Sequence, residues 1–418
     1  MITNTIRDRL SRIFWVALVV IDNAFGSDVQ PPRKIEDIEV LRALAIAYVL
    51  VAHLPALLGQ VGVPLTRFEQ IFNLGSGVDL FFVISGFVIA RSFFSEKNLE
   101  TSKGQQLALF WVRRIFRIWP AAWFWLAVSL LFTAFFNRSG VFGDLRINTG
   151  DAIAAFFQYA NIHLWQCNVL HAVACANGGV PTGIYWSLSL EEQFYFVFPL
   201  VALLLKGRAR LLFFAAFFVV QMASVKVGLL WFIRSDGLIA GVLLALMPEA
   251  VRGRFEPTIL RFPAAQIIAT VILVLSLGLL SSPDAMRIWP LAASSLPIIA
   301  GLLVFAASFA RGYLGSFGPL RPIVLWIGSR SYALYLCHFV AYCATQELWI
   351  SVIGRFGTDL RYVVALSLTG AMLLAGFAEL TYRAIEMPLR ARGYALTAAL
   401  QRHFGEKRRL LGRTVERA

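Results

Sequence analysis

Ionisable side chains occur inside stretches of this sequence that are otherwise apolar. Such residues are costly within a lipid bilayer and therefore point by default to function. Counting residues along the apolar stretches places several of them, of both charge signs, in one layer near the same membrane boundary. The full set is Arg42, His53, Asp79, Glu191, Glu192, Arg234, Asp236, Arg330, His338, Glu379 and Glu386.

His53 is the candidate catalytic base, because a neutral imidazole with an ordinary pKa near 6.5 suits proton abstraction from a hydroxyl. Arg42 precedes it by 11 residues. That is about three helical turns, so the two share a helix face and His53 lies roughly 16 Å further along. Asp79 or Glu191 would fix the tautomer of the imidazole and stabilise its protonated form. A histidine that merely packs in the core is the alternative, and Arg42 on the same face argues against it.

Two motifs that would indicate other kinds of catalysis are absent from the sequence. It contains neither a G-x-S-x-G nucleophile elbow nor an H-E-x-x-H metal motif. Direct transfer with a histidine base is therefore favoured over a serine acyl-enzyme, an acyl-histidine remains open, and no metal is expected. Arg234 and Asp236 either bind substrate or only hold two helices together as a buried ion pair.

Three arginines form a basic cluster in the segment F-W-V-R-R-I-F-R-I-W-P, which we interpret as an inner loop. They are Arg113, Arg114 and Arg117. A topology signal that also attracts anionic lipids is one reading of this cluster. The other is a clamp for multiply charged phosphates such as those of coenzyme A, because guanidinium groups pair with phosphate in forked geometry.

The elements that must position these residues are membrane spans. Hydrophobic residues make up 58% of the chain and charged residues only 15%, against about 25% charged in soluble domains. Apolar blocks have the length of about 20 residues that crosses a bilayer. The sequence predicts an all-α polytopic bundle of ten spans, at 38–58, 71–94, 119–137, 184–205, 209–227, 229–247, 263–281, 289–310, 323–349 and 362–387.

The distribution of Lys and Arg gives the orientation. With both termini in the cytoplasm, 26 of the 38 basic residues lie in inner segments and seven in outer loops, as the positive-inside rule requires. The net charge of +14 is thereby explained without nucleic acid. The weaker patch 152–165 is too short to span and is expected as a re-entrant or surface helix in an outer loop.

Segments outside the spans carry further expectations. Residues 1–34 lack a clean signal peptide and are read as a cytoplasmic segment with an amphipathic helix, while 391–418 form a basic cytoplasmic tail. Cys337 and Cys343 are expected to pack among apolar residues. The remaining two cysteines, Cys167 and Cys175, could form a disulfide if their loop is extracytoplasmic.

The motifs together resemble the acyltransferase-3 family of integral-membrane O-acyltransferases. The opening I-E-D-I-E-V-L-R-A-L-A-I-A-Y-V-L-V-A-H is similar to the R-x10-H signature of that family. The resemblance covers roughly residues 35–390, the predicted membrane domain. Later motifs match in order: G-V-D-L-F-F-V-I-S-G-F, R-R-I-F-R-I-W-P, Y-W-S-L-S-L-E-E-Q-F-Y, R-S-D-G, S-Y-A-L-Y-L-C-H and E-M-P.

The resemblance implies a role for each matching residue. His53, Arg42, Asp79 and Glu191 would form the catalytic group. The donor site would hold Arg113, Arg114 and Arg117, with Tyr332 and His338 lining the pore. The acceptor would meet Glu192, Trp186, Arg234 and Asp236.

We therefore expect an O-acyltransferase of the bacterial inner membrane, with acyl-CoA, most simply acetyl-CoA, as co-substrate and no permanently bound cofactor. The acceptor is expected to be a hydroxyl of an exopolysaccharide, a lipopolysaccharide or a lipid-linked sugar. No esterase-like domain follows the spans, which argues against two-domain transfer to peptidoglycan. A transporter that uses the buried charges as a relay and an idle subunit of an export complex are the alternatives.

Overall fold

The computed structural model describes residues 35–59, 67–94, 102–175, 181–315, 317–354 and 359–415, and it describes the side chains up to residue 403. Helices and connecting turns make up this part of the chain, and no β-strand occurs in it. The all-α class is therefore confirmed. The amphipathic helix expected within 1–34 lies outside the described residues. The chain divides into two compact units.

Within the described residues, seven helical segments are long and apolar enough to cross a membrane: Glu36–Leu58, Leu74–Phe93, Lys103–Phe135, Tyr185–Leu204, Pro263–Leu280, Ser331–Ile353 and Leu360–His403. Three predicted spans are occupied by shorter helices. These are α11 (Gly207–Met222), α12 (Leu229–Phe232) followed by α13 (Asp236–Leu246), and α17 (Ala292–Ala307). The chain is a multi-pass helical membrane protein, and ten spans with both termini inside remain a prediction.

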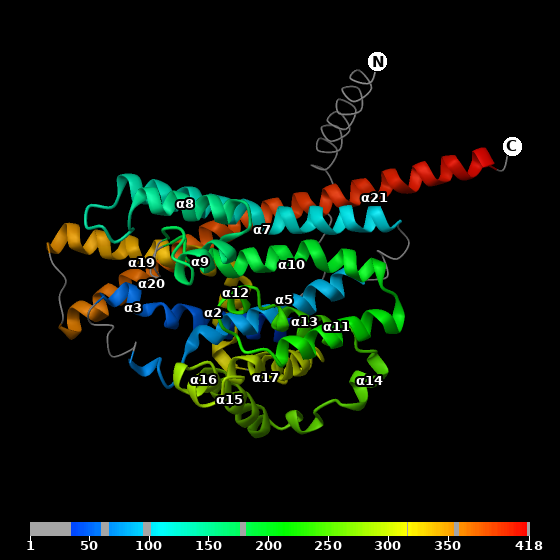
Figure 1. Cartoon of the computed structure of the whole chain (residues 1–418), viewed down its shortest axis with the longest axis horizontal. Helices are drawn as coiled ribbons and strands as arrows, with labels where there is room; N and C mark the ends of the chain where they lie inside the picture. The colour runs from blue at the N-terminus through cyan, green and yellow to red at the C-terminus, as the bar shows by residue number, and fades with distance from the viewer. Residues whose placement is uncertain are drawn as a thin grey trace, which may run out of the picture. The chain divides into compact units, whose positions relative to one another are not determined.

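The larger unit comprises 34–100 and 122–380. Its core is built where α5 (Gly77–Phe93) packs along α13, with α2 (Glu36–Ala52) beside them (Figure 1). Glycine permits the close approach of the backbones, because a Cβ on Gly86 would lie 1.9 Å from the carbonyl oxygen of Leu238. A Cβ on Gly241 would lie 2.2 Å from the carbonyl oxygen of Val83. Small residues at such crossings are typical of membrane helix packing.

Other helices of the larger unit surround this core. They are α3 (Leu54–Leu58), α8 (Leu145–Phe156), α9 (Ala160–Asn168), α10 (Tyr185–Leu204), α14 (Glu249–Arg254), α15 (Pro263–Leu280), α16 (Pro283–Ile288), α18 (Arg321–Ser329), α19 (Ser331–Ile353) and α20 (Leu360–Thr381). Short 3-10 turns lie at η2 (Leu74–Ser76), η3 (Thr258–Arg261) and η4 (Gly318–Leu320). The predicted single span 323–349 is wrong in detail, because the chain breaks at Arg330 between α18 and α19.

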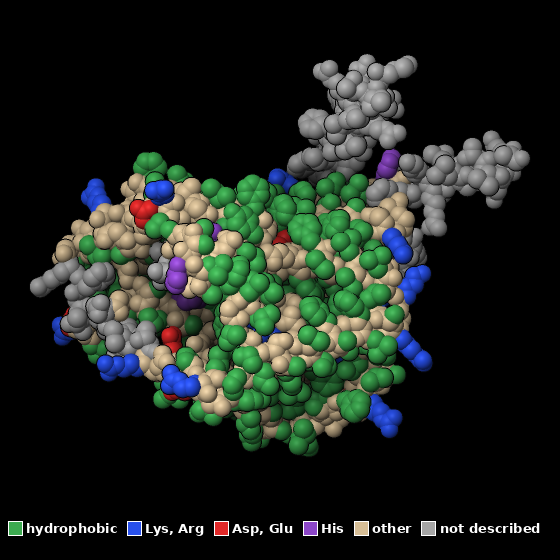
Figure 2. Space-filling view, in the orientation of Figure 1, with side chains coloured by type: hydrophobic (Ala, Val, Ile, Leu, Met, Phe, Trp, Pro, Cys, Tyr) green, Lys and Arg blue, Asp and Glu red, His purple; other side chains and the backbone are tan. Residues whose placement is uncertain are grey.

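The weak apolar patch 152–165 is divided between α8 and α9, with Gln158 at a positive φ of 60° in the break. Neither helix is long enough to cross a bilayer, in agreement with the expected non-spanning segment. Around α10, α11 and α15, hydrophobic side chains cover much of the face shown in Figure 2. Exposed apolar residues on these helices, such as Leu204, Leu212 and Ile267, suit contact with lipid.

The smaller unit contains 101–121 and 381–418. In it, α7 begins at Lys103 and continues as one helix to Phe135, which belongs to the larger unit. The basic cluster of α7 therefore lies on a helix and not in a loop, whereas its placement on the inner side of the membrane stays a prediction. After a π-helical turn at Tyr382–Glu386, α21 (Met387–Val415) forms a helix over most of the expected tail.

Candidate active site

A cavity of about 720 Å³ lies within the larger unit, among elements that are distant in sequence. Polar and aromatic side chains from the ends of several helices form much of its wall, which is the usual character of a small-molecule site. Those that carry chemistry are His53, Glu69, Asn73, Asp79, Asn168, Trp186, Trp231, Arg234 and Tyr335. The cavity thus brings together four of the sequence-predicted site residues, namely His53, Asp79, Trp186 and Arg234.

His53 lies at a break in the first span. Pro55 has no N–H to donate, and its ring would clash with the preceding helical turn, so α2 ends at Ala52 and α3 starts at Leu54. His53 adopts φ −96° and ψ 4°, in the sparsely populated bridge region where many active-site residues are found. The His53 N–H still bonds to the Val49 carbonyl oxygen at 3.1 Å, and the residue at this break lines the cavity.

His338 of α19 contacts His53 directly. Its Nε2 lies 3.0 Å from Nδ1 of His53, and its Nδ1 lies 2.7 Å from the carbonyl oxygen of Tyr335. The two rings have centroids 5.0 Å apart and planes only 23° apart, and Phe339 packs at 4.7 Å from both. His338 was expected to line a donor pore. In the structure its side chain is fully buried and contacts His53, and a role in a donor pore stays a prediction.

Asp79, in the first turn of α5, pairs with Arg234 across the cavity wall. The Nη2 atom of Arg234 lies 3.3 Å from the Asp79 carboxylate, and both side chains are buried. The guanidinium lies 4.2 Å from the ring centroid of Trp231 and 5.9 Å from that of Trp186. An arginine stacked in this way is held rigidly and stays charged.

Asp236 pairs with Lys226 and not with Arg234. The distance from Lys226 Nζ to the Asp236 carboxylate is 3.1 Å, and both side chains are buried. The alternative interpretation, a structural ion pair between Arg234 and Asp236, is therefore wrong, because each residue pairs with an opposite charge on another segment. Lys226, counted among the outer-loop basic residues, is in fact part of the packed interior.

Several other predicted residues do not line this cavity. Arg42 is bound at 2.7 Å by Glu39, one helical turn before it. Glu191 accepts a hydrogen bond from the Tyr195 hydroxyl at 3.0 Å, and Glu192 is buried within α10. Tyr332 of α19 is also absent from the lining, where Tyr335 stands one turn later. The hydrogen-bond partner of His53 Nδ1 is thus His338, and not the expected Asp79 or Glu191.

The basic cluster belongs to the smaller unit. Arg113 is half-buried beside Tyr394 of α21, and Arg114 lies 5.7 Å from the ring of Phe110. With Arg117 one turn after Arg113, two of the three guanidinium groups share one face of α7. A role of this face in binding phosphate stays a prediction.

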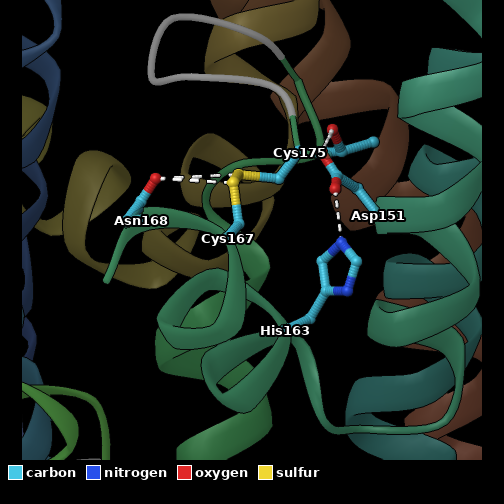
Figure 3. The surroundings of a disulfide bond; sticks show 6 residues. Asp151, His163, Cys167, Asn168 and Cys175 are labelled. Carbon is cyan, nitrogen blue, oxygen red and sulfur yellow. Dashed lines mark hydrogen bonds and ion pairs between the residues drawn. A yellow bond between two sulfur atoms is a disulfide. The ribbon is translucent and has the colours of Figure 1, made fainter. Parts of the chain in front are cut away.

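Part of the cavity wall comes from α9. The end of this helix is cross-linked by a disulfide (Figure 3). Cys167, at the end of α9, forms a disulfide with Cys175, as the loop composition allowed. On α9 itself, His163 lies 2.9 Å from Asp151 of α8, which also accepts a hydrogen bond from Thr182. These links fix α9, which supplies Leu164 and Asn168 to the cavity. Cys337 and Cys343 are buried and lie outside this disulfide, as expected.

Five of these lining residues were not predicted from the sequence, namely Glu69, Asn73, Asn168, Trp231 and Tyr335. Tyr335 lies inside the S-Y-A-L-Y-L-C-H motif, three residues before His338, and Trp231 precedes Arg234 by the same spacing. A one-turn offset from a motif residue could have found both. Glu69 lies in a connecting segment with no motif around it, and burial raises the pKa of its carboxyl.

Comparison with known proteins identifies the family to which the chain is similar. The acyltransferase domain of the acyltransferase-3 family matches residues 35–378. The chain is 28% identical over 392 residues to O-acetyltransferase OatA of Staphylococcus aureus. It is 28% identical over 391 residues to peptidoglycan O-acetyltransferase OatA of Listeria monocytogenes. It is 26% identical over 393 residues to putative peptidoglycan O-acetyltransferase YrhL of Bacillus subtilis.

These alignments cover 87–90% of this chain and 56–60% of each relative. The chain thus spans less than two thirds of the length of these relatives. No solved structure matches it significantly. The family match covers most of the chain and all of the cavity residues, and we conclude that the chain belongs to the acyltransferase-3 family.

Proposed function

We propose that this protein is a membrane-embedded O-acyltransferase that acetylates hydroxyl groups of a cell-envelope glycan. The observation that carries the proposal is His53 in the cavity wall, with Nδ1 engaged by His338 and no hydrogen-bond partner at Nε2 among the described residues. A histidine with one ring nitrogen held and the other open to a cavity has the arrangement of a general base. Family membership adds acyl transfer as the reaction class.

The acceptor is a glycan by two independent arguments. The relatives named above are O-acetyltransferases, two of them with peptidoglycan in their names. The cavity combines two indole rings with carboxylate and amide groups, a mixture suited to the apolar faces and hydroxyls of a sugar. Peptidoglycan is accordingly included among the candidate acceptors, beside exopolysaccharide, lipopolysaccharide and lipid-linked sugars.

The chemistry balances with the residues of this site. Nε2 of His53 removes the proton of the acceptor hydroxyl while the oxygen attacks the thioester carbonyl. The carbon–sulfur bond breaks, and the leaving thiolate takes the proton from the imidazolium, which gives the acetyl ester and free thiol. Arg234 is the one cation in the described lining, and its buried charge suits the oxygen that becomes negative during attack.

The donor in this proposal is cytoplasmic acetyl-CoA, bound through phosphate by the arginine face of α7. The acceptor enters from the opposite side of the bacterial inner membrane. The protein would then need no permanently bound cofactor. Transfer across the bilayer would rely on the length of the pantetheine arm.

The test compares parent protein with His53→Ala in proteoliposomes that contain acetyl-CoA and a purified cell-wall glycan. Loss of a general base costs about 10²- to 10⁴-fold in rate, so we expect both thiol release and ester formation to fall by that factor. Glu249→Gln, a change at an exposed residue of α14, which supplies no residue to the cavity lining, is the matched control. Full activity of a correctly folded His53→Ala protein would refute the proposal.

A further inference from the structure

His53 and His338 form a directed chain of two hydrogen bonds that ends on the protein backbone. The carbonyl oxygen of Tyr335 can only accept, so Nδ1 of His338, 2.7 Å away, must carry the proton of that bond. A neutral imidazole carries one N–H, and Nε2 of His338 is therefore an acceptor. Across the 3.0 Å contact, Nδ1 of His53 must then donate.

We propose that His338 is a positioning residue that holds His53 in its Nδ1–H tautomer, so that the Nε2 lone pair is presented to the acceptor hydroxyl. The inference rests on the proposed function only for what that lone pair does. The tautomer itself follows from the two contacts.

The tautomer of His338 is set within its own helix. Tyr335 lies one turn before His338 on α19, so the carbonyl and the imidazole move together. The Tyr335 side chain is fixed as well, because its hydroxyl donates to the carbonyl oxygen of Ile184 at 2.9 Å and lies 2.6 Å from Ser187 Oγ. The orientation of the chain is thus established before either substrate binds.

A carboxylate is the usual partner that fixes the tautomer of a catalytic histidine. The two candidate carboxylates of this site make other contacts. Asp79 pairs with Arg234, and Glu191 accepts the Tyr195 hydroxyl. The histidine pair lies against Phe339 and Tyr342, where an unpaired carboxylate would be costly. When Nε2 takes the substrate proton, the Nδ1–H of the resulting imidazolium still donates to His338, which spreads the new charge over two rings. The proton leaves with the thiolate, and the pair returns to its resting state.

The direct test is ¹⁵N NMR of histidine-labelled protein in lipid, because protonated and unprotonated ring nitrogens differ strongly in chemical shift. His53→Gln identifies the His53 signals by their loss. We expect protonated Nδ1 and unprotonated Nε2 at both histidines. A resting His53 with its proton on Nε2 would overturn the proposal, whatever the protein acetylates.

Substitutions of His338 separate positioning from packing. His338→Ala removes the acceptor, and we expect kcat to fall by up to about 10⁴-fold, the scale of losing tautomer control in a triad, with KM for acetyl-CoA little changed. His338→Gln offers an amide oxygen to the His53 N–H, so it should retain kcat within about tenfold and keep the Nδ1–H signal.

Tyr342→Phe is the matched packing control. It alters a side chain that touches His338 and donates to the carbonyl oxygen of Leu50, and it leaves both imidazole contacts in place. We expect the parental tautomer and kcat. Equal loss in His338→Ala and His338→Gln with an unchanged His53 tautomer would show that His338 only packs. If the tautomers are as expected but no variant or parent acetylates a glycan, the function proposed above fails and the positioning role stands.

Discussion

Arg234 and Asp236 are two residues apart, but each belongs to a different buried ion pair. We expect the two pairs to differ in function. Asp79–Arg234 borders the cavity, whereas Lys226–Asp236 does not. Breaking a buried pair by removing one partner typically costs about 3–5 kcal/mol, while replacing both is often neutral. The pairs therefore allow a test that separates stability from catalysis.

We expect Arg234→Gln alone to lower thermal stability sharply, because Asp79 is left buried and unpaired. The double variant Asp79→Asn with Arg234→Gln should recover stability but stay inactive. The control, Lys226→Met with Asp236→Asn, should be stable and active. Thermal unfolding in detergent and acetyl transfer on the same preparations measure both properties, and an active Asp79/Arg234 double variant would remove this pair from the mechanism.

At the residue scale, the sequence predicted several cavity residues correctly but not the contacts that they make with one another. The motifs located His53, Asp79, Trp186 and Arg234, all of which line the cavity. Partners could not be read because they depend on how helices distant in sequence approach each other. The Asp79–Arg234 contact joins residues 155 positions apart, and His53–His338 joins residues 285 apart.

At the element scale, the crossing of α5 and α13 positions Asp79 next to the segment that carries Arg234. Gly86→Ala places a methyl group against the Leu238 carbonyl, and such overpacking typically costs about 1–3 kcal/mol. We expect lower thermal stability and reduced acetyl transfer. Gly301→Ala on α17, where a Cβ meets nothing within 4 Å, is the control and should be neutral or slightly stabilising.

The basic face of α7 belongs to the same scale. Each charge-assisted hydrogen bond to phosphate is worth roughly 1.5–3 kcal/mol, so neutralising Arg113, Arg114 and Arg117 together should weaken coenzyme A binding at least about tenfold. Glu191→Gln should impair turnover and leave this binding intact. Calorimetry in detergent measures both variants. Parental affinity in the triple variant would leave the cluster as a topology signal only.

Hydropathy predicted the existence of most helices, but not their interruptions. It merged α18 with α19 and treated the start of α7 as a loop. Helix breaks depend on single residues such as Pro55, or on tertiary contacts such as the ion pair between Arg330 and Glu379 at 2.8 Å. Hydropathy averaged over a window of residues detects neither of them.

At the scale of the larger unit, segments assigned to the same membrane side contact one another. On the predicted inner side, Asp37 accepts from the Gly312 N–H at 2.9 Å, and Arg311 pairs with Glu256 at 2.5 Å. On the predicted outer side, the Asp284 N–H donates to the Gln70 carbonyl at 3.2 Å. This agreement supports the predicted alternation of loops and leaves the absolute orientation to experiment.

The orientation is testable with two single cysteines at exposed positions. We expect Arg146→Cys to react with a membrane-impermeant maleimide in intact cells, and Gly253→Cys to react only after lysis. The native cysteines are a disulfide pair and two buried thiols, so the parent provides a low background. The opposite labelling pattern would invert the proposed direction of transfer.

The contact between His53 and His338 also bears on how the chain is assembled in the bilayer. The translocon releases spans into lipid, and a charged residue at the centre of one costs about 2.5–3.5 kcal/mol on that scale. His53 and His338 are supplied by different helices, and each can cross as a neutral ring. An aspartate in place of His338 would make α19 harder to insert. With two imidazoles the charge arises only during turnover, after biogenesis is complete.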